Sequence, residues 1–113
     1  MSVLEKINNA MASVNVSVET GVFSDEPPSE YAVLTPLTDK FEVFADNKPT
    51  AEVSMVRISF YKIGNYLERV EQVVQALLDA DFTIMDRKYV GVDTDSKHHN
   101  YAIDIAKEKH LGG

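Results

Sequence analysis

The densest group of potential metal ligands in the sequence is a polar stretch near its C-terminal end. Asp93 and Asp95 are followed there by His98 and His99. Carboxylates and imidazoles bind divalent cations, and a turn can bring such side chains together. A metal centre also needs a fixed geometry and outer hydrogen bonds, which adjacent histidines in a loop between strands usually lack. We therefore predict a solvated turn with no metal and no cofactor, and keep a metal-dependent enzyme as a competing hypothesis.

The second group is an acidic loop in the first third of the chain. Asp25, Glu26 and Glu30 flank the adjacent prolines Pro27 and Pro28. Two carboxylates act as general acid and base when their environments separate their pKa values, and no apolar sequence encloses these three. We predict an exposed loop that serves as an interaction arm, because long irregular segments in small domains often carry function.

Arg57 is the third candidate, because it interrupts an otherwise apolar segment. Two interpretations are open. The side chain can point outward, with its aliphatic stem over its neighbours and its charged head in water. It can equally form an ion pair between subunits, since arginine is enriched at protein interfaces.

Other catalytic signatures are missing from the sequence. It has no cysteine, no glycine-rich phosphate loop and no serine in a nucleophile-elbow context. The net charge is −7 and the basic residues are scattered, which disfavours direct binding of nucleic acid. No apolar run is long enough to span a membrane, so we expect synthesis in the cytoplasm and no membrane contact. We predict that the protein is not an enzyme.

The elements that position these residues follow from periodicity. Residues 2–13 have the apolar spacing of a short helix, and the alternation over 14–19 predicts a half-buried strand. Strands are predicted at 31–35, at 41–44 and at 53–63. Pro36 ends the strand at 31–35. The strand at 53–63 is apolar on both faces, which is typical of a strand inside a sheet.

A second helix is the clearest element of the sequence. It is predicted at about 65–80, with Asn65 as its N-cap and Glu68 completing a capping box. A strand beginning at Phe82 and resuming at 89–92 should form a hairpin with 101–105. The chain is thus predicted to be one domain, 1–113, flexible after about 107. Its fold class is α+β, with one mainly antiparallel or mixed sheet of four to six strands and both helices packed on it.

The order of these segments resembles a known family. The segments are YAVLTPLTDKFEVFADN, SMVRISFYKIGN, YLERVEQVVQALLDADF and a last hairpin formed by YVGVDTD and HHNYAIDIA. Three details match: the Tyr-Ala-Val-Leu strand before Pro36, the Ala-Asp-Asn turn at 45–47, and the helix closed by Ala-Asp-Phe at 80–82. The chain resembles the tail terminator and tail-to-head joining (tail completion) proteins of long-tailed bacteriophages.

The resemblance implies a structural role in virion assembly. Members of the family form a ring, commonly a hexamer, from subunits that can be monomeric in solution. The ring terminates growth of the tail tube, joins the tail to the head, or does both. The implied partners are other copies of the chain, the tail-tube protein and the head connector protein. The implied location is the host cytoplasm during assembly and then the neck region of the virion tail, in a phage or a prophage.

The assembly surfaces of the family are sheet edges and extended loops, which correspond here to the loop Asp25–Glu30 and the turn Asp46–Thr50. Together with Arg57, which is a candidate from its own position in an apolar strand, the predicted interface residues are Asp25, Glu26, Pro27, Pro28, Glu30, Asp46, Asn47, Lys48 and Arg57. The alternative hypothesis is a small α+β regulatory domain that acts as a dimer and binds a ligand or peptide.

Overall fold

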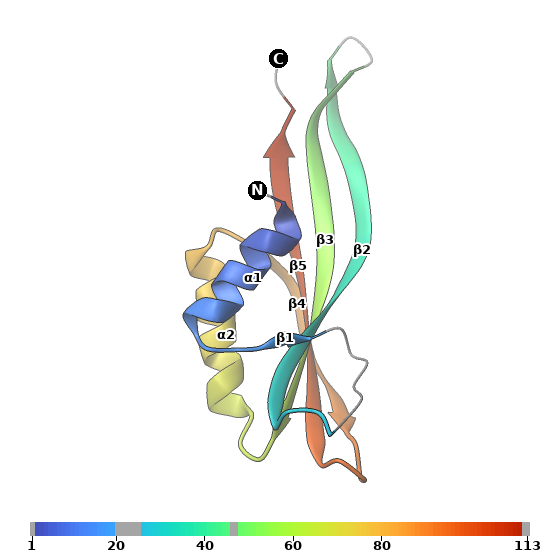
Figure 1. Cartoon of the computed structure of the whole chain (residues 1–113). Helices are drawn as coiled ribbons and strands as arrows, with labels where there is room; N and C mark the ends of the chain where they lie inside the picture. Colours follow the sequence, from blue (N-terminus) through green and yellow to red (C-terminus); the bar gives the residue numbers. More distant parts are fainter. Residues whose placement is uncertain (1, 20–25, 46–47, 112–113) are drawn as a thin grey trace.

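The protein, described by a computed structural model over residues 2–19, 26–45 and 48–111, is built on a single sheet with two helices on one face (Figure 1). The elements are α1 (Val3–Ser13), β1 (Val18–Glu19), β2 (Glu30–Ala45), β3 (Lys48–Ile63), α2 (Leu67–Asp79), β4 (Thr83–Val92) and β5 (His98–His110). The strand order is β1-β2-β3-β5-β4. Only β1 pairs in parallel, with β2, so the predicted α+β class with a mixed sheet is confirmed.

β3 is the centre of the sheet, as its two apolar faces predict. It pairs with β2 along one edge and with β5 along the other. Its even-numbered residues Val56, Ile58 and Phe60 are buried under the helices. Its odd-numbered residues face the opposite side of the sheet, because side chains alternate along a strand. We call that side, which no described helix covers, the open face.

The hydrophobic core lies between the sheet and the two helices. Ile7 and Met11 of α1 and Leu77 of α2 are fully buried against the even-numbered side chains of β3 and the isoleucines of β5. The apolar stripe of α2 is therefore its sheet-facing side, as predicted. Neither α1 nor α2 is long and apolar enough to cross a membrane.

The β2–β3 hairpin extends well past the helices (Figure 1). We call its far part, residues 38–45 and 48–55, the distal arm. The sequence predicts two strands separated at Pro36, and this is wrong, because β2 is continuous with a bulge between Pro36 and Thr38. The N–H of Ala32 points away from β3, to the Ser17 carbonyl. Pro36 lies four residues further on the same side, where its missing N–H breaks no bond to β3.

Two predicted boundaries at helix ends are also wrong. The strand predicted at 14–19 is reduced to the two residues of β1, because Val14 closes α1 and Asn15 adopts a φ of 60°. The N-cap of α2 is Tyr66 rather than Asn65, and no side chain caps it. Asn65 instead accepts a hydrogen bond from the N–H of Leu67 at 3.2 Å, so the predicted capping box with Glu68 does not form.

The C-terminal hairpin is longer than the sequence indicates. β4 runs without a break from Thr83 to Val92, with bulges between Ile84 and Asp86 and between Tyr89 and Gly91. β5 continues to His110, which lies opposite Ala51 of the distal arm. The flexible tail predicted after residue 107 is therefore strand as far as His110, because the arm supplies a hydrogen-bonding partner.

Truncation of the core should destabilise the fold far more than truncation of the distal arm. We expect Phe60→Ala to lower the free energy of unfolding by about 3–5 kcal/mol, since a fully buried phenyl ring is lost. The matched control is Phe41→Ala, expected within about 0.5 kcal/mol of the wild type, because Phe41 is 58% exposed whereas Phe60 is 0% exposed. Urea denaturation of dilute protein measures both, and equal losses would contradict this placement of the core.

Candidate functional site

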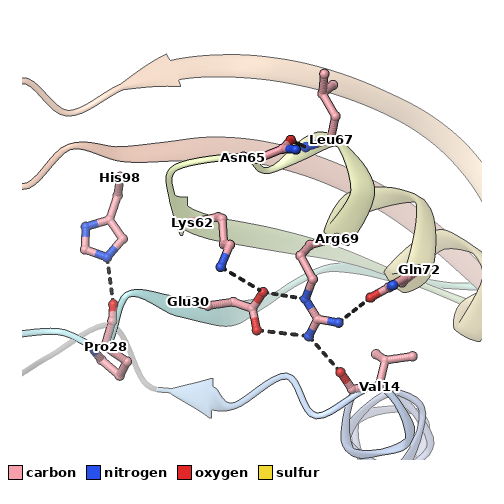
Figure 2. Close-up of polar contacts among 9 residues, drawn as sticks. All are labelled: Val14, Pro28, Glu30, Lys62, Asn65, Leu67, Arg69, Gln72 and His98. Carbon is pink, nitrogen blue, oxygen red and sulfur yellow. Dashed lines mark hydrogen bonds and ion pairs between the residues drawn. The ribbon is translucent and has the colours of Figure 1, made fainter.

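The two adjacent histidines do not converge on a metal. His98 is 4% exposed, and its Nε2 lies 2.7 Å from the carbonyl oxygen of Pro28 (Figure 2). Its ring meets that of Tyr31 edge to face. His99 contacts other residues, with its Nδ1 2.8 Å from the hydroxyl of Tyr89 and its ring beside Tyr66. Successive residues of a strand point to opposite faces, which separates the two imidazoles.

Asp93 holds the turn that precedes β5. Its Oδ1 accepts hydrogen bonds from the backbone N–H groups of Ser96 at 3.1 Å and Asp95 at 2.8 Å. These bonds, that of Ser96 first, lower the pKa of Asp93. Within residues 2–19, 26–45 and 48–111, no group of three or more histidine, cysteine or acidic side chains is arranged to hold a metal ion. The polar stretch therefore contains a turn that Asp93 stabilises.

Glu30 does not lie in an acidic loop but in a cluster of ion pairs and hydrogen bonds that joins four elements of the structure. Both of its carboxylate oxygens accept hydrogen bonds from Arg69 of α2, at 2.6 Å from Nε and 2.9 Å from Nη2 (Figure 2). The same Nη2 donates to the carbonyl of Val14 at 2.7 Å, and Nη1 donates to Gln72. The Nζ of Lys62 is 3.7 Å from Glu30. The cluster joins the end of α1, the start of β2, the end of β3 and the first turns of α2.

The charges of this cluster stabilise one another. The hydrogen bond from Arg69 holds the pKa of Glu30 below its ordinary value of 4.5, although partial burial acts in the other direction. The reciprocal bond raises the pKa of Arg69. A bidentate pair of this kind fixes orientation as well as distance. Glu30, expected to be an interface residue on a loop, is thus the first residue of β2 and anchors α2 to the sheet.

Arg57 has a partner within its own chain. It lies directly opposite Asp104 of β5 on the open face, with Nε 2.7 Å from Oδ1 and Nη2 3.0 Å from Oδ2. The hydrogen bond from Arg57 lowers the pKa of Asp104. The side chain of Arg57 is 38% exposed. It is therefore an outward-facing arginine held by a cross-strand ion pair, and this carboxylate belongs to the same subunit.

The other predicted interface residues are not brought together. Glu26 and Pro28 are exposed and Pro27 is half-buried. Pro28 contacts His98, which lies opposite Ile63 at the end of β3, whereas Lys48 is exposed at the start of that strand. The predicted set thus falls at two opposite ends of the longest strand. Asp25, Asp46 and Asn47 lie outside the described residues.

Sequence reasoning missed the surface along the two edges of the sheet. Among the described residues, β1 pairs only with Ala32 and Val33, so the rest of β2 has no strand on its outer side. β4 has no described strand on its outer side either. Large exposed apolar side chains gather along these edges, at Leu37 and Phe41 on β2 and at Met85, Tyr89, Val90 and Val92 on β4. No local signal identifies them, because an edge is defined by the order of strands.

A groove of about 700 Å³ lies where the start of α1 faces the distal arm. Leu4 and Lys6 line one side, and Pro36 and Glu52 are on the sheet side. Lys107 also lines it, although its Nζ donates to the carbonyl of Asp81 at 3.0 Å. Apolar groups and charges of both signs share the lining, which suits a polypeptide surface better than a reaction that needs converging acids and bases.

The Glu30–Arg69 pair should make stability depend on acid. The pKa of Glu30 is lower in the folded chain, so the unfolded chain takes up the proton more readily and stability falls as the pH drops from 4.5 through the folded pKa. We expect Glu30→Gln to lower stability at neutral pH and to flatten this dependence. Urea denaturation between pH 3 and 7, roughly the span over which carboxylates titrate, measures it.

The matched control for that experiment is Glu42→Gln, at an exposed position on the same strand. This change should leave both the stability at neutral pH and its acid dependence as in the wild type. An equal flattening in both variants would mean that the cluster does not anchor α2.

The described geometry therefore offers two sheet edges, an open face and a groove as surfaces for binding, and ion pairs that serve the fold. Known proteins add no further assignment. Neither a comparison with models of protein families nor a search of curated protein sequences found a match.

Proposed function

We propose that the chain is a structural subunit that assembles into a ring at the head-proximal end of a phage or prophage tail. There it stops growth of the tail tube, joins the tail to the head, or does both. Two independent facts support the proposal. The order of sequence segments resembles the tail terminator and tail completion proteins, and the structure places several of its large exposed apolar side chains along sheet edges.

The single observation that carries the proposal is the uncovered sheet. The described chain measures 54 × 26 × 23 Å, far from spherical, because the distal arm extends past the helices (Figure 1). Edge strands with unpaired backbone groups are templates for another strand, and monomeric proteins usually cover or shorten them. Here both edges are long and carry apolar side chains, which is what a subunit needs when it completes its sheet by assembly.

The two edges favour a ring over a pair. They belong to different strands, β2 and β4, and contact between unlike surfaces is head-to-tail. Head-to-tail contacts form a closed ring when the rotation between neighbours closes, and an open filament when it does not. The net charge of −7 opposes association of identical subunits in solution. A tail tube that gathers subunits at its end would raise their local concentration and overcome this repulsion.

Deletion of the gene from a phage or prophage that carries it should disrupt tail assembly. We expect tails of abnormal length or tails without heads, because the end of the tube then has no cap and no joint. Electron microscopy of lysates and titres of infectious particles measure the effect, and supplying the wild-type gene from a plasmid is the control. Normal tails and titres after deletion would refute the role in the tail.

A dimeric regulatory domain is the second candidate, and the groove beside α1 is the observation that favours it. This role requires a stable dimer and a peptide or small molecule that binds in the groove. Sedimentation of the purified chain separates the two candidates: a dimer that persists on dilution favours the regulatory role, whereas a monomer that forms rings on tail tubes favours the assembly role.

A further inference from the structure

The two edges of the sheet carry complementary residues in matching order. The outer edge of β2 presents Asp39 and Lys40 just beyond its bulge, and the edge strand β4 presents Asp86 and Arg87. We propose that β4 of one copy pairs antiparallel with β2 of a second copy, with Arg87 opposite Asp39 and Asp86 opposite Lys40. This inference rests on the proposed ring and specifies the contact that builds it.

The backbone groups of these residues point the right way. The N–H of Ile63 points to the β2 side, at Ser29, so odd-numbered residues of β3 bond to β2 and even-numbered residues to β5. Asp39 lies opposite Ser54, so its own backbone groups point outward. Ile103 of β5 lies opposite the even-numbered Ile58, so its backbone groups bond to β3 and not to β4. Arg87 lies opposite Ile103, so the backbone groups of Arg87 also point outward. Asp39 and Arg87 are thus able to exchange both backbone hydrogen bonds.

The side chains of each proposed ion pair share a face of the sheet. Asp39 lies opposite Ser54, and Arg87 is in line with Ile58 through Ile103 of β5. Ser54 and Ile58 are even-numbered residues of β3, so both charged side chains are on the helix-covered face. Lys40 and Asp86 are on the open face by the same register. Opposite charges directly across an antiparallel pair attract, and like charges repel. Arg87 is available for exchange, since its present partner Glu71 is 3.7 Å away and 75% exposed.

Apolar side chains flank these charges in the same register. By residue count, Leu37 of β2 comes opposite Tyr89 of β4 two residues from the Asp39–Arg87 pair. On the other side, Phe41 comes opposite Met85 one residue from the Lys40–Asp86 pair. Leu37 and Met85 each lie in a bulge of their own strand. All four are among the large apolar side chains exposed in the single subunit. The pairing would therefore cover the apolar groups that the isolated edges leave in water, which is a favourable contribution to association.

The register also offsets neighbouring subunits along the strands. Along the strand direction, Arg87 lies at the position of Ile58 of β3, and Asp39 lies at the position of Ser54. When Arg87 of one copy is opposite Asp39 of the next, the second copy is therefore shifted by four residues along the strands. This is roughly 13 Å of displacement across the four strands β2, β3, β5 and β4, about 19 Å of sheet, which tilts the strands by about 35°. Closed barrels of strands tilt by about 35–45°, so the displacement has the size that closure into a ring requires.

Disulfide trapping tests the register directly, because the chain contains no cysteine. Thr38 and Lys88 would be directly opposite in a pair with closely spaced Cβ atoms, a separation that a disulfide accepts. We would mix the Thr38→Cys chain, carrying a size tag, with the untagged Lys88→Cys chain at a protein concentration high enough to offset the repulsion of the net charge. Oxidation then traps even transient contacts, and the products are separated without reductant. The band of intermediate size should exceed either self-linked band at least tenfold, and the chain with both changes should give a ladder.

A control for location pairs Thr38→Cys with Glu68→Cys, an exposed position on α2 rather than on a strand. This mixture should give a tenth or less of the intermediate band. A self-linked Lys88→Cys band that dominates would overturn the proposal in favour of a two-fold β4–β4 contact, which places position 88 against its own copy. An intermediate band no stronger than in the Glu68 control would also overturn it.

Charge reversal tests the ion pairs separately from the cysteines. Asp39→Arg in the Thr38→Cys chain, or Arg87→Asp in the Lys88→Cys chain, should reduce the intermediate band at least tenfold. The two changes together restore the attraction and should recover the band. Far-ultraviolet circular dichroism and urea midpoints equal to the wild type show that each variant folds, as expected for exposed residues. Unchanged yield in both single variants, or no recovery in the combination, would overturn the register.

The outcomes separate this contact from the proposed role. Rings visible by electron microscopy without the Thr38–Lys88 disulfide would mean that the register is wrong and the ring stands. The disulfide together with normal particles after gene deletion would mean that the strands pair as proposed and that the role in the tail is wrong.

Discussion

The structure depends on a mismatch of length between its helices and its strands. An α-helix advances about 1.5 Å per residue and a strand about 3.3 Å. α2 has 13 residues and α1 has 11, whereas β2 and β3 have 16 each. Two short helices therefore shield only one end of a long hairpin, and the core ends where they end. Because the helices do not cover the whole hairpin, they leave exposed the distal arm, the groove beside α1 and the outer edge of β2.

Two arginines within this frame fix its geometry through ion pairs. Arg69 binds Glu30 and the Val14 carbonyl at once, so it aligns both helices with the sheet. Arg57 and Asp104 form a pair between neighbouring strands on the open face. Each of these charges already has a partner in its own subunit. The charges on the sheet edges differ, since Asp39, Lys40 and Asp86 are exposed on strands that lack an outer neighbour in the described chain.

Local patterns in the sequence predicted what local physics determines. The apolar stripe of α2 indicated its sheet-facing side, and the two apolar faces of β3 indicated its central position in the sheet. The odd-numbered face of β3 is nevertheless only half-buried. Pro36 was misleading because a proline interrupts a strand only if its missing N–H faces a partner, and that depends on strand order. Arg69 and Val14 are 55 residues apart, and no periodicity connects them. The edges of the sheet escaped prediction for the same reason, because an edge exists only relative to the strands that do not cover it.

The position of β5 has a consequence for the timing of synthesis. β5 follows every other described strand in the sequence, yet it lies inside the sheet between β3 and β4. On a ribosome, β3 and β4 must therefore emerge before the strand that joins them. Until β5 inserts, the sheet has extra edges that could capture the wrong strand. A nascent chain without β5 cannot present β2 and β4 as the two edges of one sheet, so the proposed ring contact has to wait until translation of the subunit is finished.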